Sequence, residues 1–296
     1  MGTKSKIASA SALLMALAVS PAARGQGTAP VAAQYETGRA AVENVIRESG
    51  AKEVSVAFRS LDGSDEFFIQ AGQEIQATPQ WVEIPVMIEL YAEVQTRALR
   101  FDSLLLVHNS FHSAVGQSVY HLDPGRDPDP ELYHEIGRQL TLRELEQQMM
   151  MRNSQLATNL LIEHLGLSQI NERIARLHGS GVELRHGFQD ADATGAGLRN
   201  TESARGMMEV LWALANNAVT SAEASKEMMG VLANARTAET GPFSGAAASG
   251  AAGTSQEALV VYGAHSFALA VVTQGLEAGP TTALMAKISH ALTASN

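Results

Sequence analysis

Three histidines lie close together in the sequence, and the imidazole ring is a common ligand of metal ions. His108 and His112 are four residues apart, and His121 follows them. Together these side chains could bind a metal ion such as zinc. However, they flank a stretch rich in proline and glycine, and no acidic residue lies at helical spacing beside them. Ordinary surface histidines are the favoured interpretation, so we expect neither a metal ion nor another cofactor.

Other familiar catalytic patterns are missing from the sequence. The chain has no cysteine, which excludes a disulfide bond, a thiolate nucleophile and a cysteine-ligated cluster. His134 and Glu135 begin a pattern of the zinc-protease type, but Arg138 occupies the position of its second histidine. No strict Gly-x-Ser-x-Gly nucleophile motif occurs. Several classes of catalytic site are thereby excluded.

The composition is that of an acidic globular protein. The chain has 296 residues with 45% hydrophobic content, which is enough for a sizeable core. Lys and Arg number 21 against 31 Asp and Glu, so the net charge is −10. An acidic chain with 5% aromatic residues is a poor match for nucleic acid, which attracts basic and aromatic side chains. We therefore expect no nucleic-acid partner, and we interpret the acidic excess as a solvated surface.

The first 25 residues have the features of an export signal. Lys4 and Lys6 precede an apolar run at 7–19, which ends near the small residues Ala22 and Ala23. This run is too short to span a bilayer, and no later apolar stretch is longer. We expect a mature chain that begins near Gln26, has no membrane span and is periplasmic or secreted.

Strand patterns occur towards both ends of the chain. Val54, Val56 and Phe58 alternate with other residues, a turn signal follows at 62–63, and a return strand begins at 67. A second strand pair is expected at 258–262 and 267–273. Because each pair leaves unpaired strand edges and one apolar face, we expect one antiparallel sheet, covered by helices at 35–50 and 281–292.

The middle of the chain is predicted to be mainly helical. Apolar residues recur at spacings of three and four, and Thr220 and Glu223 form a capping-box pattern. We expect an ordered surface crossing at 110–130, and at 241–255 either a flexible segment or a loosely packed strand. The fold class is therefore α+β, with one domain at 26–296. Its α/β lobe comprises about 35–78 and 245–296, and its helical lobe about 79–244. The expected helices are 79–96, 142–150, 155–165, 168–178, 201–216 and 220–232.

Four segments, in this order along the chain, resemble the serine β-lactamase and penicillin-recognising hydrolase family of the class A type. They are Ile84-Pro85-Val86-Met87-Ile88-Glu89-Leu90-Tyr91, Leu156-Ala157-Thr158-Asn159-Leu160-Leu161-Ile162, Gly197-Leu198-Arg199-Asn200-Thr201 and residues 259–275. The resemblance covers nearly all of the mature chain. It implies a β-lactamase-like fold with an antiparallel sheet, flanking terminal helices and an all-helical lobe.

The motifs that carry the chemistry of that family are altered. In the family, a serine and a lysine three residues apart supply the nucleophile and its base. The resemblance places Gln80 at the serine and Glu83 at the lysine. It also places Asn153, Ser154 and Gln155 where the family has Ser-Asp-Asn, and Ala248, Ser249 and Gly250 where it has Lys-Thr/Ser-Gly. An amide is not a nucleophile, so no intact catalytic set is expected.

Two functions remain open at this stage. The favoured one is a non-hydrolytic relative with a binding or structural role, whose ligand could be an unknown small molecule or a peptidoglycan-like or β-lactam-like compound. The residue changes shift the local charge by about −2, and a like charge about 4 Å from a ligand carboxylate costs roughly 4 kcal/mol at an effective dielectric of 20. The alternative is an active hydrolase with relocated groups, in which Glu83 is the base or Thr78 or Ser113 is the nucleophile.

Several further side chains near the expected cleft allow two interpretations. Asp190 and Asp192 could lie near the position of the family's deacylating carboxylate, but we expect both to be solvated loop residues. The methionines at 149–151 could line a groove, although core filling is favoured. Trp81 could fill the pocket or stack on a ligand, and its sequence position does not decide between these roles.

Overall fold

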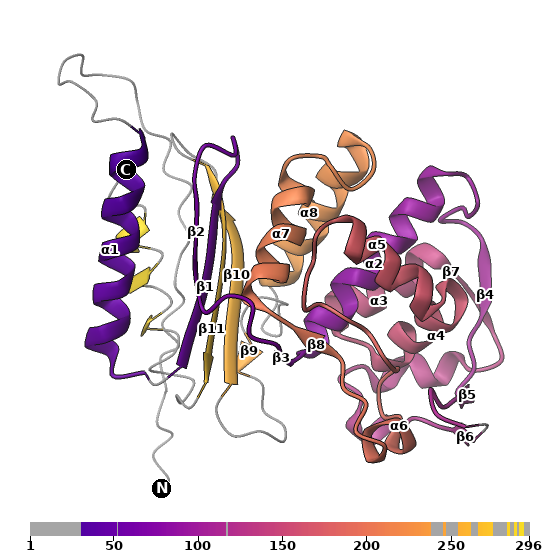
Figure 1. Cartoon of the computed structure of the whole chain (residues 1–296). Coiled ribbons are helices and arrows are strands. Elements are labelled where there is room, and N and C mark those ends of the chain that lie inside the picture. Colours follow the sequence, from indigo (N-terminus) through magenta and orange to yellow (C-terminus); the bar gives the residue numbers. More distant parts are fainter. Residues whose placement is uncertain are drawn as a thin grey trace, which may run out of the picture.

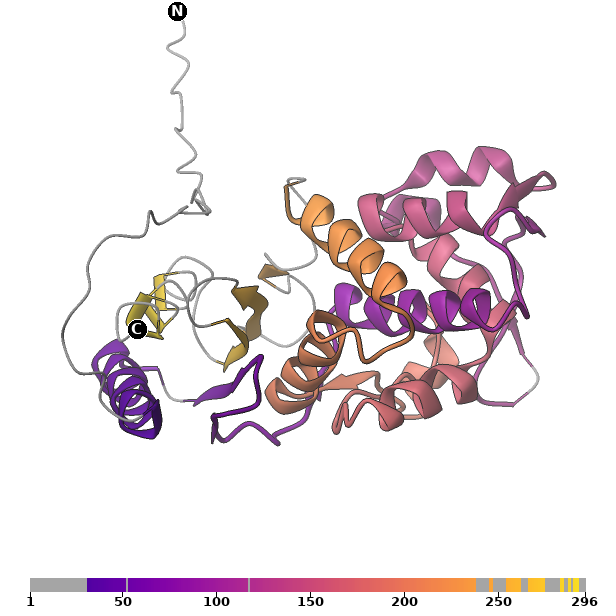
Figure 2. The same cartoon turned by 90° about the horizontal axis from the view of Figure 1, so that it is seen from above.

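The structure is a computed structural model that describes residues 31–51, 53–116, 118–237, 245–246, 254–261, 266–274, 283–284, 287–288 and 290–292. The expected export signal at 1–25 lies outside these residues. Figures 1 and 2 show a β-sheet with helices on both of its faces, followed by a bundle of helices at one side. No helix in the described part is long and apolar enough to cross a membrane.

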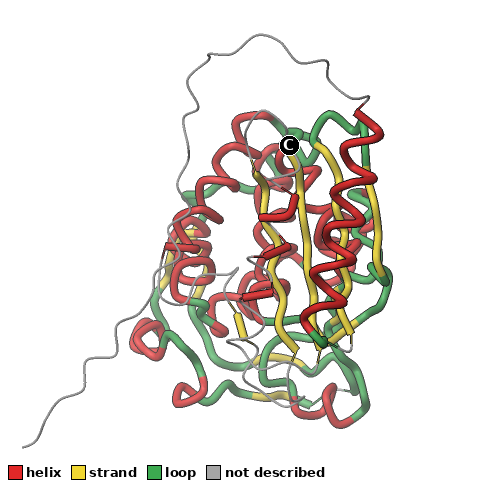
Figure 3. The backbone as a smooth tube through the Cα atoms, turned by 90° about the vertical axis from the view of Figure 1, so that its left-hand side faces the viewer, coloured by secondary structure: helices red, strands yellow, loops and turns green. Residues whose placement is uncertain are grey.

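The sheet joins the two ends of the chain, as the sequence predicts. It has five strands in the order β2-β1-β11-β10-β9, and neighbouring strands are antiparallel. In the central pair, Val56 lies opposite Val271. The strands are β1 (Glu53–Ser60), β2 (Glu66–Ile69), β9 (Gly245–Ala246), β10 (Thr254–Val261) and β11 (Phe267–Gln274). Figure 3 views this sheet from the side on which the first helix crosses it.

One face of the sheet is covered by α1 (Val31–Ser49) and by helical residues near the C terminus. Alternate residues of β1 point to this face, and Phe58 stacks on Phe67 with ring centroids 5.0 Å apart. Gly50 ends α1 with a φ of 69°, a left-handed conformation that suits glycine. The residues buried here are Val42, Val54, Val56, Phe58, Phe67, Phe267, Leu269, Val271, Leu284, Ile288 and Leu292.

The other face packs against α7 (Ala204–Ala215), where the indole N–H of Trp212 donates to the carbonyl of Ser60 at 2.8 Å. Beyond α7 lies the helical bundle, centred on α2 (Pro79–Gln95). The other helices are α3 (Leu142–Arg152), α4 (Gln155–Leu165), α5 (Leu167–Arg176), α6 (Ala191–Gly195) and α8 (Ala222–Thr237). Each helix of four or more turns therefore lies where the apolar periodicity predicts one.

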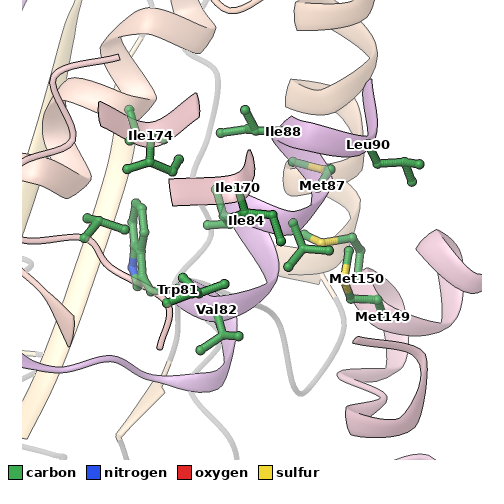
Figure 4. Close-up of a cluster of buried hydrophobic side chains, with 14 of the residues drawn as sticks. Trp81, Val82, Ile84, Met87, Ile88, Leu90, Met149, Met150, Ile170 and Ile174 are labelled. Atoms are coloured by element: carbon green, nitrogen blue, oxygen red, sulfur yellow. The ribbon is translucent and has the colours of Figure 1, made fainter. Parts of the chain in front are cut away.

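The helix α2 is buried on all sides from Trp81 to Ala92, because α3, α4, α5 and α8 pack around it. Figure 4 shows its apolar side chains meeting those of α3 and α5. Trp81 is 1% exposed, which assigns it to the core. Met149 and Met150 are also buried in this core, as favoured, whereas Met151 is partly exposed.

Three small antiparallel pairs lie outside the main sheet. They are β3 (Ile75–Gln76) with β8 (Thr201–Glu202), β4 (Leu104–Leu106) with β7 (Gln139–Thr141), and β5 (Phe111–His112) with β6 (Val119–Tyr120). The crossing at 110–130 thus contains short strands and the 3₁₀ turn Pro124–Arg126, and a second 3₁₀ turn, Pro130–Glu135, begins at its end.

Several helix starts differ from the sequence-based expectation. The helix expected at 35–50 begins earlier, at Val31. Local contacts explain two of the other differences. The helix expected from 201 begins at Ala204, because Thr201 and Glu202 pair with β3 and the hydroxyl of Ser203 accepts from the backbone N–H of Gly206. Similarly, α8 is capped by Ser221, whose hydroxyl accepts from the N–H of Ala224 at 3.2 Å, and not by Thr220. Local sequence patterns predict these helices but misplace their first residues.

Candidate functional site

The start of α2 holds the two residues that the resemblance places at the nucleophile and its base. Thr78 is the buried N-cap residue. Pro79 opens the helix at a position where a backbone N–H would have no intrahelical acceptor, and proline has no N–H to leave unsatisfied. Gln80 and Glu83 are three residues apart, so they lie on one face of α2. Gln80 is half-buried, whereas Glu83 is fully buried.

Glu83 is a carboxyl group in an apolar setting. Neither of its oxygens has a hydrogen-bond partner among the residues that the structure describes. Burial raises the pKa of Glu83 well above its usual value, and the nearby negative charge of Asp127 raises it further. Burial therefore favours the uncharged form of Glu83, and its side chain does not meet solvent.

Asp127 connects this position to the start of α4. One of its carboxylate oxygens accepts from the backbone N–H of Gln155 at 3.1 Å, and the other accepts from that of Leu156 at 2.9 Å. The hydroxyl of Tyr133 also donates to Asp127 at 2.9 Å. These bonds satisfy N–H groups that a helix start leaves without an intrahelical partner. They also tie the surface crossing to the start of α4.

The turn between α3 and α4 carries the next three site residues. Asn153 has a left-handed backbone with a φ of 52°, which ends α3. Ser154 is fully buried, and its hydroxyl caps α4 by accepting from the N–H of Ala157 at 3.3 Å. The side-chain oxygen of Gln155 accepts from the amide of Gln189 at 2.8 Å. Ser154 is therefore a helix cap, in agreement with its unsuitable register for proton relay.

The described residues bring together only part of the expected site. Gln80 and Glu83 share one helix face, and Asp127 places Glu83 beside the turn at 153–155. Ala248, Ser249 and Gly250 lie outside the residues that the structure describes.

The two loop aspartates differ from each other. Asp190 is 1% exposed, so the expectation of a solvated side chain is wrong for it. It accepts from the hydroxyl of Ser113 and the N–H of Ala114, both at 2.8 Å, and it caps α6 through the N–H of Ala193 at 3.0 Å. Burial acts to raise the pKa of Asp190, but these hydrogen bonds outweigh it and lower the value. Asp192 is exposed, as expected.

The hydroxyl groups proposed as relocated nucleophiles are both in buried residues. Thr78 is 4% exposed and Ser113 is 8% exposed. The hydroxyl of Ser113 donates to Asp190 and accepts from the backbone N–H of Val115 at 3.2 Å. Ser113 thus connects the surface crossing to the loop at 190, which is a structural role.

The three histidines do not gather into a metal centre. His108 contacts Glu163 of α4 at 2.9 Å, and its ring lies 5.1 Å from that of Phe111. His112 is on β5, and His121 is exposed. Within the described ranges, no group of three His, Asp or Glu side chains could hold a metal ion.

Two buried acids near the site were not singled out from the sequence. Asp127 lies in a run of alternating aspartate and proline, which signals local turns but not contacts with α4. Glu202 of β8 is fully buried, and neither of its oxygens has a partner at hydrogen-bonding geometry among the described residues. Burial raises the pKa of Glu202, and the nearby backbone N–H of Thr78 offsets part of that shift. No local signal marks Glu202 as buried, because β8 is only two residues long.

Solved structures of known proteins share this fold. A β-lactamase from Sphaerobacter thermophilus has a TM-score of 0.62 and 20% identity, over 88% of this chain and 97% of that chain. A β-lactamase from Chitinophaga pinensis has a TM-score of 0.67 and 16% identity, over 88% of this chain and 99% of that chain. The protein PBP-A has a TM-score of 0.65 and 14% identity, over 88% and 95% of the two chains. At such low identity, these similarities establish the fold alone.

The comparison of sequences establishes more than the fold. None of the curated proteins matches the chain. The profile described as "Beta-lactamase enzyme family", however, matches residues 38–295. This match includes α2, the turn at 153–155, the buried acids and the whole sheet. The chain therefore belongs to the β-lactamase enzyme family.

Proposed function

We propose that this protein is an exported, non-hydrolytic member of its family, with a binding or structural role. The observation that supports this most strongly is the state of Glu83. Where the family resemblance places an amine that removes a proton from the nucleophile, this chain has a fully buried carboxyl group with unpartnered oxygens and a raised pKa. A protonated acid cannot act as a general base.

The neighbouring position also lacks the required chemistry. Gln80 supplies an amide, which does not attack a carbonyl group as a serine hydroxyl does. In enzymes with a nucleophile and base of this kind, loss of the nucleophile alone costs on the order of 10⁶ in turnover. Asn153 replaces the hydroxyl that the family motif uses for proton relay. Each of these three positions independently disfavours hydrolysis.

An active hydrolase with relocated groups is the weaker candidate. A base must reach the proton of a water molecule at hydrogen-bonding distance, and Glu83 is 0% exposed. Thr78 and Ser113 would have to reach a substrate from buried positions, and the hydroxyl of Ser113 already donates to Asp190. These contacts favour structural roles for both hydroxyl groups.

The burial of Glu83 also weakens the charge argument made from the sequence, because it favours the uncharged form of this carboxyl group. In that form, the loss of two lysines and one aspartate shifts the local charge by about −1 and not −2. A ligand carboxylate is therefore less favoured than in the family pattern, but it meets less repulsion than the sequence alone indicates. A peptidoglycan-like or β-lactam-like ligand could still bind without reacting.

The test uses the mature chain from Gln26 onward. We expect no hydrolysis of a chromogenic cephalosporin above the buffer rate, and no covalent label from a fluorescent penicillin. A catalytically active class A β-lactamase, assayed in parallel, shows that the reagents work, and circular dichroism shows that the chain is folded. An antibiotic-derived mass adduct on this chain would overturn the proposal.

A second measurement examines the hydrolase alternative directly. Panels of ester and amide substrates are assayed against pH with the wild type and with Glu83→Gln. We expect both proteins to match the buffer blank at every pH. A wild-type rate that rises with pH and disappears in Glu83→Gln would identify Glu83 as a working base and contradict the proposal.

A further inference from the structure

A cavity of about 460 Å³ lies between α3 and α8, apart from Gln80 and Glu83. Its volume is within the range of sites that bind small molecules. Residues of two helices line the cavity, and their side chains include positive, negative and apolar groups. These residues include Arg143, Glu146, Met151 and Arg152 of α3, and Glu227 and Val231 of α8.

Glu146 is the feature that indicates a ligand. Its side chain is 1% exposed, and one of its oxygens makes only a long contact of 3.4 Å with Arg143. The other oxygen is buried and has no hydrogen-bond partner among the described residues. A buried carboxylate oxygen without a donor is unfavourable. A bound ligand that donates a hydrogen bond would satisfy it.

The charges around Glu146 favour a donor that is itself positive. The guanidinium group of Arg143 serves two carboxylates, since it also contacts Glu227 at 2.7 Å and the hydroxyl of Tyr91 at 2.8 Å. A single arginine thus faces two glutamate carboxyl groups, and Glu227 has the shorter contact with it. Arg143 is also held in place above the ring of Phe101, 3.5 Å from its centroid. It therefore cannot turn to satisfy Glu146 more closely without losing these contacts.

The lining of the cavity also includes a cation. Arg152 is 55% exposed, and its contact with Asp129 is long, at 3.4 Å. Glu146 and Arg152 are six residues apart on α3, which places their backbones about 9 Å apart along the helix axis. Met151 and Val231 contribute apolar surface to the same lining. The cavity thus combines an acceptor, apolar surface and a positive group.

We propose that the α3–α8 cavity binds a short zwitterionic ligand, with its ammonium group at Glu146 and its carboxylate at Arg152. The separation of the two side chains fits a short peptide better than a single amino acid, whose charged groups are only a few ångström apart. This site is independent of whether the chain hydrolyses anything, because none of its residues belongs to the α2 site.

The first test compares matched probes by isothermal titration calorimetry with the mature chain. The probes are glycine, triglycine, N-acetyl-triglycine and triglycine amide. We expect triglycine to bind, and each blocked form to bind at least tenfold more weakly. Equal binding of the blocked and free peptides, or no binding of triglycine at 10 mM (roughly the limit for a specific weak site), would overturn the proposal. Tighter binding of glycine than of triglycine would contradict the peptide length.

Variants then locate the site. Glu146→Gln and Arg152→Gln should each weaken triglycine binding by about tenfold. The matched control is the exposed ion pair of α5, for which Glu172→Gln and Arg176→Gln should leave binding unchanged. Loss of binding in Gln80→Ala with no effect of Glu146→Gln would move the ligand to the α2 site and refute this assignment.

Proton release provides a readout that a merely structural role would not give. Burial raises the pKa of Glu146 to about 7, while Arg143 lowers it and the charge of Glu227 raises it again. Below that pH, an ammonium group at Glu146 should displace a proton. Calorimetry at pH 6 in buffers of different ionisation enthalpy should detect the release in the wild type and not in Glu146→Gln.

Discussion

Asp127 holds the start of α4 and at the same time places a negative charge beside the buried carboxyl group of Glu83. The two acids differ in the hydrogen bonds that their surroundings offer. Asp127 accepts four hydrogen bonds, from three backbone N–H groups and one tyrosine hydroxyl, whereas the described residues offer none to Glu83. The hydrogen bonds stabilise the charged form of Asp127, whereas burial without partners favours the uncharged form of Glu83.

The first prediction concerns Glu83 and the pH dependence of stability. Because the pKa of Glu83 is raised in the folded state, its folded state binds the proton more tightly than the unfolded chain does. Stability is full below the unfolded pKa and falls as the pH rises towards the folded pKa. The loss cannot exceed about 1.4 kcal/mol per pH unit for one carboxyl group.

The measurement is urea unfolding from pH 4 to pH 9. Glu83→Gln should remove part of the pH-dependent loss of stability. The free energy of unfolding of the variant, relative to that of the wild type, should therefore rise with pH. Glu48→Gln, in an exposed position of α1, is the control and should follow the wild type. Parallel curves for Glu83→Gln and the wild type at all pH values would show that Glu83 does not titrate abnormally.

The second prediction concerns the cap on α4. Asp127→Ala removes an acceptor for two N–H groups at the helix start and leaves the Tyr133 hydroxyl without its partner. We expect the free energy of unfolding to fall by about 2 kcal/mol or more. Asp123→Ala removes a comparable cap from the exposed 3₁₀ turn at 124–126, and should cost less than about 1 kcal/mol. Equal losses in the two variants would contradict the role assigned to Asp127.

The third prediction concerns Glu146, whose pKa is raised by burial from 4.5 to about 7. The folded state again binds the proton more tightly, so stability falls between about pH 4.5 and pH 7 and is constant above. The full difference is up to about 3 kcal/mol. Chemical unfolding without ligand checks this. Glu146→Gln should be more stable than the wild type at pH 8 and similar to it at pH 4. An advantage that is the same at both pH values would indicate a packing effect.

The fourth prediction concerns the N terminus. Expressed from Met1 in a Gram-negative bacterium, the chain should lose its first 25 residues or so and be recovered from the periplasm or the medium. N-terminal sequencing of that fraction should begin near Gln26. Replacement of Lys4 and Lys6 by glutamate should reduce export, because the signal needs positive charge ahead of its apolar run. Recovery of the full-length chain in the cytoplasm alone would contradict the assignment.

The sequence predicts the sheet and the long helices because their signals are local and repeated. Alternation along β1 and apolar spacing along α2 and α4 persist over many residues, and the glycine after α1 marks its end. The joining of the two hairpins into one sheet was also predictable, since each hairpin alone would leave an edge open. The open-edge argument did not specify that β1 and β11 form the junction. Tertiary contacts explain where the structure differs from the prediction. For example, Thr201 pairs with β3, and α7 therefore begins later in the sequence than expected.

The candidate site was less predictable than the fold. Family resemblance identifies Gln80 and Glu83, but their burial depends on how α3, α4 and α5 surround α2. Asp127 meets the start of α4 from 28 residues away, and no local pattern encodes such a contact. Asp190 has an ordinary loop sequence around it, yet Ser113 and Ala114 enclose it from a distant segment. Side chains whose partners are far along the chain require a structure.

The arrangement of the sheet has a consequence for how the protein is made. Since β1 lies between β2 and β11, a ribosome must release almost the whole polypeptide before β1 can acquire its second neighbour. Until then, the hairpin formed by β1 and β2 presents an apolar flank and a row of unsatisfied amide groups. Nascent chains and products of premature termination should accordingly depend on chaperones, and they should be rapidly degraded when these are scarce.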